Sequence, residues 1–427
     1  MKRLAKNIVV AVLNWQTRRL YNKNSFKVVV VSGSIGKTST KLAVAQLLSA
    51  RFKVQYQDGN YNDVVTVPLV FFGLTEPSLM NPLAWFGTFL KIEQILKKPY
   101  PYDVVVVEVG TDYPGNLAKF KSYLRGDIGV VTGVALEHME FFDDLDAVAQ
   151  EEFSISEYCD QLLANADLCD QKYLRPFAER VKTYALNSDA AYKFTDIATN
   201  KTSTSFTVLA DGKQITTAVY PTIFPTKLYS LCAAVSVGHA LGLASEKLVA
   251  GLAKVLPVNG RMQLLEGINQ TTIIDDTYNA SPGAMKAALD ALYSLEAPQK
   301  IALLGNMNEL GSYSEAAHTE VGNYCDPKQL SVVVTLGTDA NKFLATAAKA
   351  SGCQVKAVDT PYEAAEFIKT ILKPGAVLLA KGSQNGVFAE EAVKQLLANP
   401  EDVSLLIRQS KDWMRIKEKN FGKVVHE

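Results

Sequence analysis

The stretch that decides the fold reads Gly33-Ser34-Ile35-Gly36-Lys37-Thr38-Ser39-Thr40. A run of valines at positions 28–31 comes directly before it and indicates a buried β-strand. After it, apolar residues recur at helical spacing over positions 41–48. A strand, a glycine-containing turn, a Lys-Thr pair and a helix in this order are the context that a phosphate-binding loop needs.

The residue types in this stretch suit the binding of phosphate. Gly33 and Gly36 allow the backbone to curl, so that successive N–H groups point at an anion. The helix start adds partial positive charge, Lys37 would reach the β- and γ-phosphates, and the Thr38 hydroxyl would ligate Mg²⁺. We therefore predict an ATP site whose loop residues are Gly33, Ser34, Gly36, Lys37, Thr38 and Ser39. The glycine spacing is shorter than in the common motif, so an ordinary glycine turn before a helix is the alternative.

Length and composition narrow the class of protein. A chain of 427 residues exceeds what one hydrophobic core usually serves, so we expect two or three domains. The 44 basic and 44 acidic residues give a net charge of zero, so the chain has no overall positive potential that would favour binding to nucleic acid. Five scattered cysteines without a C-x-x-C motif indicate free thiols in a reducing, cytoplasmic compartment and no zinc site.

The first 25 residues form a separate feature. Basic residues flank the apolar run 8–13, which has the length of a signal-peptide core but lacks a small-residue cleavage site after it. We predict a basic amphipathic helix over residues 1–25. Two interpretations stay open: the helix packs on the first domain, or it contacts a membrane surface that carries anionic lipid. No apolar run reaches the roughly 18–20 residues of a membrane span.

Beyond this helix the pattern predicts an α/β protein. Residues 26–257 read as a P-loop central domain with a parallel sheet, and residues 258–427 as a Rossmann-like C-terminal α/β domain. In the first domain we expect strands at 54–56, 102–107, 128–132 and 162–167, an acidic helix at 143–158, a helix at 228–243, and an antiparallel segment at 194–219. Residues 68–96 are predicted to be buried helices and loops.

The second domain repeats the alternation of strands and helices. Its predicted strands are 271–274, 300–304, 331–336 and 376–380, and its predicted helices are 282–295, 315–324, 341–350, 362–372 and 389–397. The tail beyond Asp402 reads as a solvated basic helix.

Polar residues that follow buried strands are candidates for the site, because ligands bind at the carboxyl edge of a parallel sheet. Glu108 ends the strand at 102–107, where its carboxylate could hold Mg²⁺ near Thr38. A solvent-facing acid at a strand end is the alternative. His138 follows the next strand, either as a metal ligand or as an ordinary loop residue. In the second domain the segments 275–282, 304–311 and 381–383 occupy equivalent positions and suggest a face that closes on the first domain.

The order and spacing of these segments resemble the Mur ligases, the ATP-dependent amide ligases of peptidoglycan precursors. The matching pieces run from Gly33 to about Glu391 and include GSIGKTSTK, GNYND, VVVEVG, HME, NGRMQ, DDTYNASPGAMKAAL, LGNMNELG and AKGS. DDTYNASP with LGNMNELG resembles one branch, whose members add D-Ala-D-Ala to a UDP-MurNAc-tripeptide. The resemblance implies that ATP converts a peptide carboxylate to an acyl phosphate, which an amine then attacks.

The resemblance also implies roles for individual residues. Lys37, with Thr38, would neutralise charge on the transferring phosphoryl group. Glu108 matches the family's Mg²⁺-binding glutamate, and His138 matches a ligand of a second Mg²⁺. Asn279 and the 304–311 loop match C-terminal groups that reach the nucleotide when the domains close.

The sequence departs from the family pattern at four places. About 32 residues precede Gly33, too few for the family's UDP-binding domain. Glu152 aligns with a lysine that many members carbamylate, so we expect its carboxylate to serve as the metal ligand directly, with Glu151 as the second choice. Asn306 stands where the family has a ribose-contacting aspartate. Thr226-Lys227 stands where a His-Asn pair near the adenine is expected.

From these residues we predict an ATP- and Mg²⁺-dependent amide ligase, monomeric and cytoplasmic, that adds D-Ala-D-Ala to a UDP-MurNAc-tripeptide. Two other hypotheses remain. A ligase of the same family could act on a non-UDP or lipid-linked carrier, or on a polyamide. From another class, a non-ligating P-loop protein could bind ATP in a regulatory role. ATP turnover that depends on the amine substrate distinguishes the ligases from the regulator.

Overall fold

The strand of valines before the phosphate loop is buried on both faces, so the N-terminal half has a layer of helices on each side of its sheet. In β1 (Lys27–Ser32), Val28 and Val30 pack into one hydrophobic cluster, and Val29 and Val31 pack into another. A strand covered on both faces needs a continuous apolar run, which explains why the sequence here does not alternate. The structure is a computed structural model that describes residues 2–57, 59, 61–135, 141–200, 203–308, 310–384 and 386–422.

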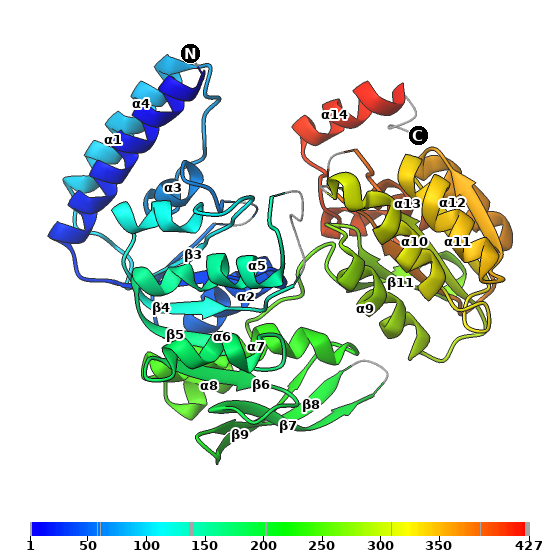
Figure 1. Ribbon diagram of the computed structural model, residues 1–427, viewed down its shortest axis with the longest axis horizontal. Helices are drawn as coiled ribbons and strands as arrows, with labels where there is room; N and C mark the ends of the chain where they lie inside the picture. The colour runs from blue at the N-terminus through cyan, green and yellow to red at the C-terminus, as the bar shows by residue number, and fades with distance from the viewer. Residues whose placement is uncertain are drawn as a thin grey trace. The chain divides into compact units, whose positions relative to one another are not determined.

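The chain divides into two compact units (Figure 1). Unit 1 ends at Leu256, and unit 2 begins at Pro257. The sheet of unit 1 has nine strands in the order β2-β3-β1-β4-β5-β6-β7-β8-β9. Neighbouring strands from β2 to β7 pair in parallel, and β7, β8 and β9 pair antiparallel, which confirms the antiparallel segment predicted at 194–219. The other strands are β2 (Val54–Gln55), β3 (Val104–Glu108), β4 (Gly126–Val131), β5 (Cys159–Asn165), β6 (Val181–Ala185), β7 (Tyr192–Thr199), β8 (Thr204–Ala210) and β9 (Lys213–Tyr220).

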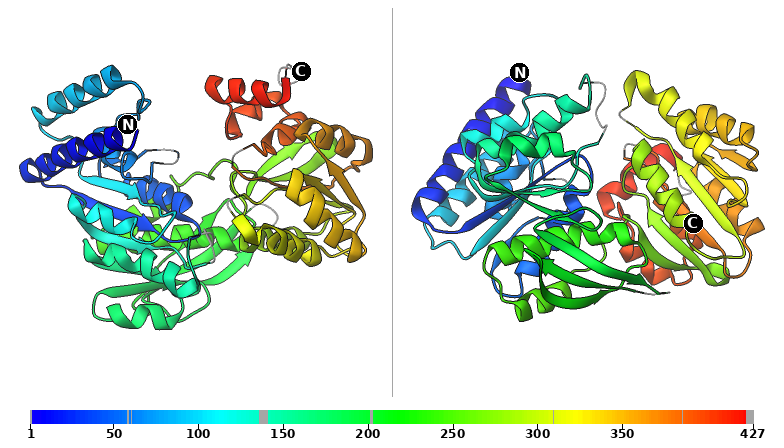
Figure 2. Two further views of the ribbon diagram at one scale, coloured as in Figure 1. Left: turned by 45° about the horizontal axis from the view of Figure 1, so that its top comes forward. Right: turned by 60° about the horizontal axis from the view of Figure 1, so that its bottom comes forward.

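Helices cover both faces of this sheet (Figure 2). One face carries α2 and α7, and the other carries α1, α3 and α4. The helices of unit 1 are α1 (Lys2–Lys23), α2 (Lys37–Leu48), α3 (Thr66–Phe72), α4 (Pro82–Leu96), α5 (Leu145–Phe153), α6 (Gln171–Leu174), α7 (Leu228–Ala240) and α8 (Ser245–Leu252). Residues 68–96 are only partly buried, contrary to the prediction. Helix α3 is buried along its whole length. Helix α4 leaves Leu83 and Phe86 largely exposed, because only one side of α4 packs against the rest of unit 1.

The sheet of unit 2 has six strands in the order β10-β11-β15-β12-β13-β14. Only β10 is antiparallel to its neighbour, which makes the unit a largely parallel α/β layer structure as predicted. The strands are β10 (Gln263–Gly267), β11 (Thr271–Asp276), β12 (Lys300–Gly305), β13 (Val332–Leu336), β14 (Val355–Val358) and β15 (Val377–Lys381). The prediction missed β10 and β14, which lie at the two edges of the sheet and carry fewer buried residues than the central strands.

The helices of unit 2 lie between and after these strands. They are α9 (Pro282–Tyr293), α10 (Ser314–Tyr324), α11 (Ala345–Ala350), α12 (Pro361–Ile371), α13 (Glu390–Leu396) and α14 (Lys411–Phe421). The tail is not a fully solvated helix, contrary to the prediction. Although α14 is basic, its Lys417 is buried and pairs with Glu390 at 3.1 Å and with Glu391 at 2.5 Å.

All five cysteines are buried and free. Burial raises the pKa of each of the five thiols. Within the described ranges, no cluster of three or more His, Cys, Asp or Glu side chains forms a ready metal site. In that same part of the chain, no helix is both long and apolar enough to cross a bilayer.

Candidate active site

The loop between β1 and α2 has the shape that its two glycines predict. Gly33 has φ of 124° and Gly36 has φ of 83°, both in the region that favours glycine. A Cβ atom on Gly33 would lie 2.3 Å from Thr132 Oγ1 and 2.7 Å from the Thr132 backbone nitrogen. The Ser34 N–H donates to the Gly133 carbonyl at 2.8 Å. The loop therefore lies directly against the end of β4, and only glycine fits at position 33.

The side chains of this loop combine a cation with hydroxyl groups. Lys37 Nζ donates to the Gly33 carbonyl at 2.6 Å, so the ammonium lies over the loop. Thr38 is buried in the first turn of α2, next to Ser39. Ser34 Oγ is buried and has no hydrogen-bond partner among the residues that the structure describes. The loop thus offers a hydroxyl, a cation and the N-terminus of a twelve-residue helix to an anionic ligand.

Glu152 of α5 contacts the start of the loop. One of its carboxylate oxygens accepts hydrogen bonds from the Gly33 N–H at 2.7 Å and from the Ser32 hydroxyl. The side chain is only 1% exposed. The carboxylate that the sequence predicts as a metal ligand is therefore in direct contact with the phosphate loop.

Glu151, the second choice, makes a different set of contacts. Its two oxygens accept from Thr111 Oγ1 at 3.1 Å, from the Gly115 N–H at 2.7 Å and from the Leu117 N–H at 2.7 Å. These bonds hold the segment that follows β3. Neighbouring glutamates on one helix thus face two different loops, and only Glu152 faces the phosphate loop.

Glu108 ends β3 beside Val31 of β1, and it is buried rather than solvent-facing. Its carboxylate lies 3.3 Å from Lys41 Nζ, and Asn62 Nδ2 donates to it at 3.3 Å. Lys41 also donates to the Gly59 carbonyl at 2.9 Å. The sequence reading missed Lys41, although a lysine among the apolar residues of a buried helix was a signal that it needed a partner.

Three described side chains at this edge carry oxygen atoms, the kind of donor that Mg²⁺ prefers. Thr38, Glu108 and Glu152 all border the phosphate loop or its helix. His138, predicted as a further metal ligand, lies outside the described residues.

In unit 2 the loop after β11 is held by charged side chains. Asp276 pairs with Lys381 of β15 at 2.8 Å and accepts from the Met262 N–H at 3.1 Å. Lys381 donates in turn to the carbonyl of Asn279, and Ser383 Oγ donates to Asn279 Oδ1 at 3.3 Å. The predicted segments 275–282 and 381–383 therefore meet at one edge of this sheet.

Arg408, more than 100 residues further along the chain, also holds the loop after β11 in place. Arg408 donates to the carbonyls of Tyr278 at 2.6 Å and Thr277 at 3.4 Å, and it pairs with Glu390 at 3.1 Å. The Arg261 guanidinium also stacks over the Tyr278 ring at 4.1 Å. The sequence analysis assigned neither arginine a role, although Arg261 stands in the NGRMQ segment that resembles the family.

Family models match both units of the chain. The model of the Mur ligase middle domain matches residues 31–236, which include the phosphate loop, Glu108 and Glu152. The model described as Mur ligase, glutamate ligase domain, matches residues 260–384, which include the loop after β11. The chain belongs to the Mur ligase family. It is accordingly an ATP-dependent ligase, and the family resemblance predicted from the motifs is confirmed.

Several similar proteins carry the name of one branch of the Mur ligases. A protein of Bacillus subtilis (strain 168), named UDP-N-acetylmuramoyl-tripeptide–D-alanyl-D-alanine ligase, is 26% identical over 378 residues, which cover 88% of this chain and 76% of the relative. The MurF crystal structure from Acinetobacter baumannii superposes with a TM-score of 0.75 at 21% identity, covering 92% of this chain and 80% of that one. MurF from Thermotoga maritima, solved with ADP, gives 0.72 at 24% identity, covering 90% and 83%. The two structures establish the shared fold.

The structure describes the surroundings of two positions that we predicted to depart from the family pattern, Asn306 and the Thr226-Lys227 pair. Asn306 Oδ1 accepts from the Ala340 N–H at 2.8 Å, so the amide already fixes the start of the next helical segment. Nearby, His318 Nε2 accepts from the Met307 N–H at 3.0 Å, and burial lowers the pKa of His318 and favours this neutral acceptor. Thr226 is exposed and lies with Lys227 in a short 3₁₀ turn before α7.

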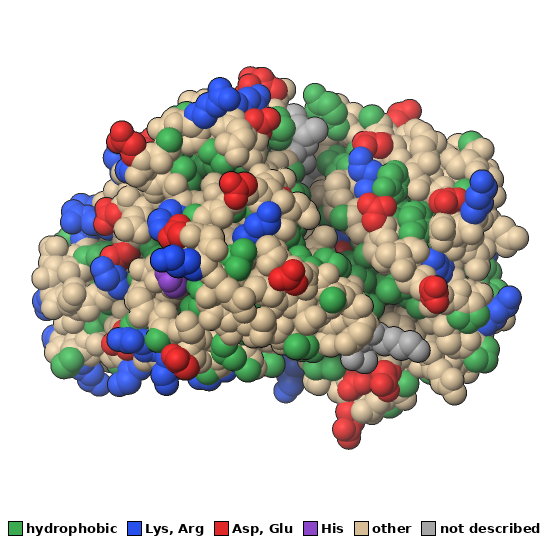
Figure 3. All heavy atoms as spheres, turned by 90° about the horizontal axis from the view of Figure 1, so that it is seen from below, with side chains coloured by type: hydrophobic (Ala, Val, Ile, Leu, Met, Phe, Trp, Pro, Cys, Tyr) green, Lys and Arg blue, Asp and Glu red, His purple; other side chains and the backbone are tan. Residues whose placement is uncertain are grey.

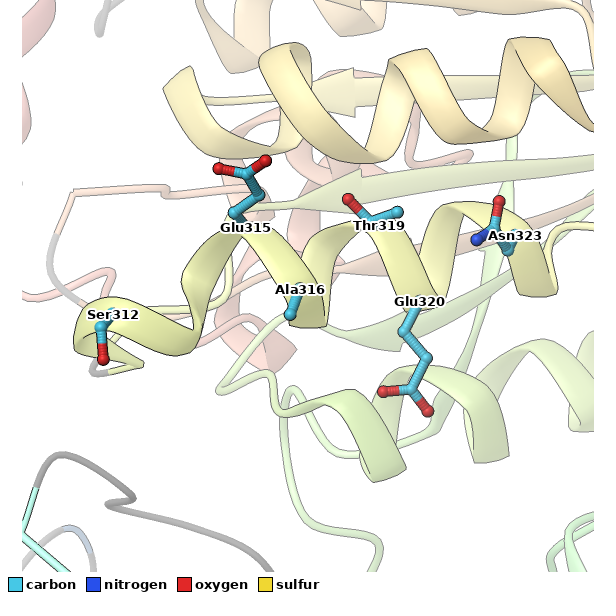
Figure 4. Close-up of a pocket in the computed structure, with 6 residues that line it drawn as sticks. All are labelled: Ser312, Glu315, Ala316, Thr319, Glu320 and Asn323. Atoms are coloured by element: carbon cyan, nitrogen blue, oxygen red, sulfur yellow. The ribbon is translucent and has the colours of Figure 1, made fainter.

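An open groove on unit 2 is not part of this site. It runs along α10 and is lined by Ser312, Glu315, Ala316, Thr319, Glu320 and Asn323 (Figure 4). Glu320 pairs with Lys286 of α9 at 2.5 Å. None of the predicted site residues lines this groove, and its two acids stand on the exposed side of a helix.

Proposed function

We propose that this Mur ligase adds D-Ala-D-Ala to a UDP-MurNAc-tripeptide in the synthesis of peptidoglycan precursors. The observation that carries the proposal is the match, over 88% of the chain, to a ligase named for that reaction. The site supports it, because the phosphate loop with Lys37 and the loop around Asn279 are both formed.

The chemistry follows from the groups at each loop. The γ-phosphoryl group of ATP passes to an oxygen of the peptide carboxylate, which leaves ADP and an acyl phosphate. The amine of D-Ala-D-Ala attacks the acyl carbon, a proton leaves the nitrogen, and the C–O bond to phosphate breaks to give an amide. In the first step Lys37 and the N–H groups of the loop stabilise the charge on the transferring phosphoryl group.

We propose that Thr38, Glu108 and Glu152 hold Mg²⁺, together with His138. When bound, Mg²⁺ neutralises charge on the ATP phosphates and on the transferring phosphoryl group. Glu152 would then supply directly the carboxylate that a carbamylated lysine supplies in many relatives. Because Lys41 pairs with Glu108, we infer that this lysine holds the carboxylate in position for the ion.

For the C-terminal unit we propose that Asn279 and Asn306 contact the nucleotide. We assign residues 26–257 to the ATP-binding domain and residues 258–427 to the ligase domain, after an N-terminal helix at 1–25.

The balanced charge, and the mixed acidic and basic side chains on the face of unit 1 seen in Figure 3, support small-molecule substrates rather than nucleic acid. We further propose that the protein is a cytoplasmic monomer.

A matrix of substrates tests the function. Phosphate release is measured with ATP and Mg²⁺ over several acceptors, with and without D-Ala-D-Ala, and products are identified by mass. We expect UDP-MurNAc-tripeptide to gain the mass of one D-Ala-D-Ala. Product on a lipid-linked or polyamide acceptor alone would replace the proposed substrate but keep the ligase chemistry. ATP hydrolysis that ignores every acceptor and amine would favour the regulatory alternative.

A further inference from the structure

Two helices of unit 1 form an outer layer with an unusual surface. Helices α1 and α4 lie side by side (Figure 1). Gln16 donates to the Phe89 carbonyl at 3.2 Å, Arg19 pairs with Glu93 at 2.6 Å, and Lys23 donates to the Leu96 carbonyl at 3.3 Å. Because these contacts advance together along both helices, the two helices run in the same direction.

Each helix buries one side within unit 1, and α4 packs mainly on α1. On α1 the buried apolar positions are Val9, Leu13 and Leu20, and on α4 they include Ile92 and Leu96. Positions three, four or seven residues apart lie on one side of a helix. The buried side of each helix is therefore well defined, and so is the opposite, exposed side.

The opposite sides carry large apolar residues rather than polar ones. On α1, Leu4, Ile8 and Trp15 are 67%, 56% and 53% exposed, at spacings of four and seven. On α4, the exposed apolar residues are Leu83, Phe86 and Leu90, at 82%, 61% and 48%. Because the two helices are adjacent, the two stripes belong to the same outer layer of unit 1, and we call them together the apolar surface.

The sequences of the two helices and of the residues after α4 are rich in basic residues. By sequence, α1 contains no acidic residue and six basic ones, Lys2, Arg3, Lys6, Arg18, Arg19 and Lys23, of which Lys6 pairs with Asp63 at 3.7 Å. Helix α4 contains one acid, Glu93, which is already paired with Arg19. Lys91, Lys97 and Lys98 are exposed on or just after α4. The chain as a whole has balanced charge, so this layer concentrates positive charge next to exposed apolar side chains.

We propose that α1 and α4 together dock on a membrane surface that contains anionic lipid. The apolar stripes insert among the acyl chains near the headgroups, and the basic residues contact the lipid phosphates. The 22-residue α1 is about 33 Å long at 1.5 Å per residue, which gives an extended line of contact in the membrane plane. Trp15, with the Arg19 guanidinium 4.4 Å above its ring, lies where aromatic residues meet the lipid–water boundary. This inference does not depend on the ligase substrate.

Cosedimentation of the full chain with vesicles tests the proposal. Phosphatidylcholine vesicles are compared with vesicles containing phosphatidylglycerol at low and high salt. We expect at least tenfold tighter binding to the anionic vesicles, and a loss of most of that binding in high salt. The emission of Trp15, assigned by comparison with Trp15→Phe, should shift to shorter wavelength on binding.

Matched variants distinguish membrane binding by this surface from nonspecific adsorption of exposed apolar residues. Replacing Leu83, Phe86 and Leu90 by serine should weaken vesicle binding about tenfold or more, with the Tm unchanged, because these side chains are exposed. The control replaces Val219 and Leu256 by serine, which are 68% and 64% exposed elsewhere on unit 1, and should bind like the wild type. Equal binding to neutral vesicles, absence of binding, or a dimer in sedimentation velocity that the serine variant abolishes would each overturn the proposal.

Discussion

The phosphate loop of unit 1 and the loop after β11 of unit 2 occupy equivalent places in their sheets, yet they are held differently. The phosphate loop takes its shape from Gly33 and Gly36, which lie within it. The loop after β11 has no glycine between Thr277 and Ser281 and depends on Lys381 and Arg408, more than 100 residues away.

This difference shows two ways to build a binding loop at a sheet edge. A loop shaped by its own glycines does not depend on distant ion pairs for its conformation, so its function is sensitive to the chemistry of a few contiguous side chains. A loop held by distant charged residues keeps its conformation only while those ion pairs and hydrogen bonds are intact. Substitutions in the first loop should therefore impair activity, and substitutions around the second should impair stability as well.

The largest effect is expected from Lys37→Ala in the phosphate loop. The ammonium stabilises charge that develops during phosphoryl transfer, and losing such a group costs on the order of 10³-fold in kcat. The Tm should stay close to that of the wild type, since the side chain is only half-buried. Steady-state kinetics and thermal denaturation are the measurements. Activity within tenfold of the wild type would contradict the role given to this loop.

Glu152→Ala comes next, compared with Glu151→Ala. If Glu152 holds Mg²⁺ directly, its loss should lower activity by about 100-fold at low Mg²⁺, with partial recovery at high Mg²⁺. Activity of the wild type should not depend on bicarbonate. Glu151→Ala should mainly lower the Tm, because Glu151 accepts three hydrogen bonds from the segment at 111–117. Titration of Mg²⁺ against rate separates the two variants, and wild-type turnover by Glu152→Ala would exclude its proposed role.

Arg408→Ala tests the loop that is held from a distance. Removing one partner of a buried ion pair costs roughly 3–5 kcal/mol, so unit 2 should unfold at lower denaturant concentration. We expect activity to fall about tenfold, because the carbonyls of Thr277 and Tyr278 lose their donor. The control is Arg415→Ala, whose side chain is 76% exposed and which should change stability by less than about 0.5 kcal/mol. Equal effects of the two substitutions would remove the distinction between the loops.

The smallest effect concerns Asp275, which precedes the second loop. Burial raises the pKa of Asp275 to about 7, and its Oδ1 accepts from Thr277. Between about pH 4 and 7 the folded carboxyl holds a proton that the unfolded chain has released, so its contribution to the free energy of unfolding falls as pH rises. Asp275→Asn should therefore raise the Tm at pH 8 and lose this advantage toward pH 4. A difference in Tm that is independent of pH would contradict this assignment.

The sequence predicted best where the determinants are contiguous. The valine run, the glycines and the Lys-Thr pair of the phosphate loop stand together, so the strand, the loop and the helix could be derived in order. The choice of Glu152 depended on the family pattern, and the structure adds its contact with Gly33. Edge strand β14 was missed because two of its four residues are exposed, so it lacks the continuous apolar pattern of the central strands.

What could not be predicted are the contacts between distant segments. Glu390, Glu391, Arg408 and Lys417 form one buried charged group, but each alone looks like a surface residue in the sequence. Burial raises the pKa of Glu390 despite the neighbouring cations, which shows how far this group is removed from solvent. The exposed stripe of α4 was likewise missed, because apolar residues on a helix predict burial unless the packing is known.

The burial of the five cysteines makes this chain convenient to label. Thiol reagents react with the thiolate, and all five native thiols are enclosed and have raised pKa values. A single cysteine introduced at an exposed position, for example by Phe86→Cys on α4, would be the fast-reacting thiol in the otherwise native protein. A fluorophore or spin label attached there would report the polarity around the outer helices without removal of any native cysteine.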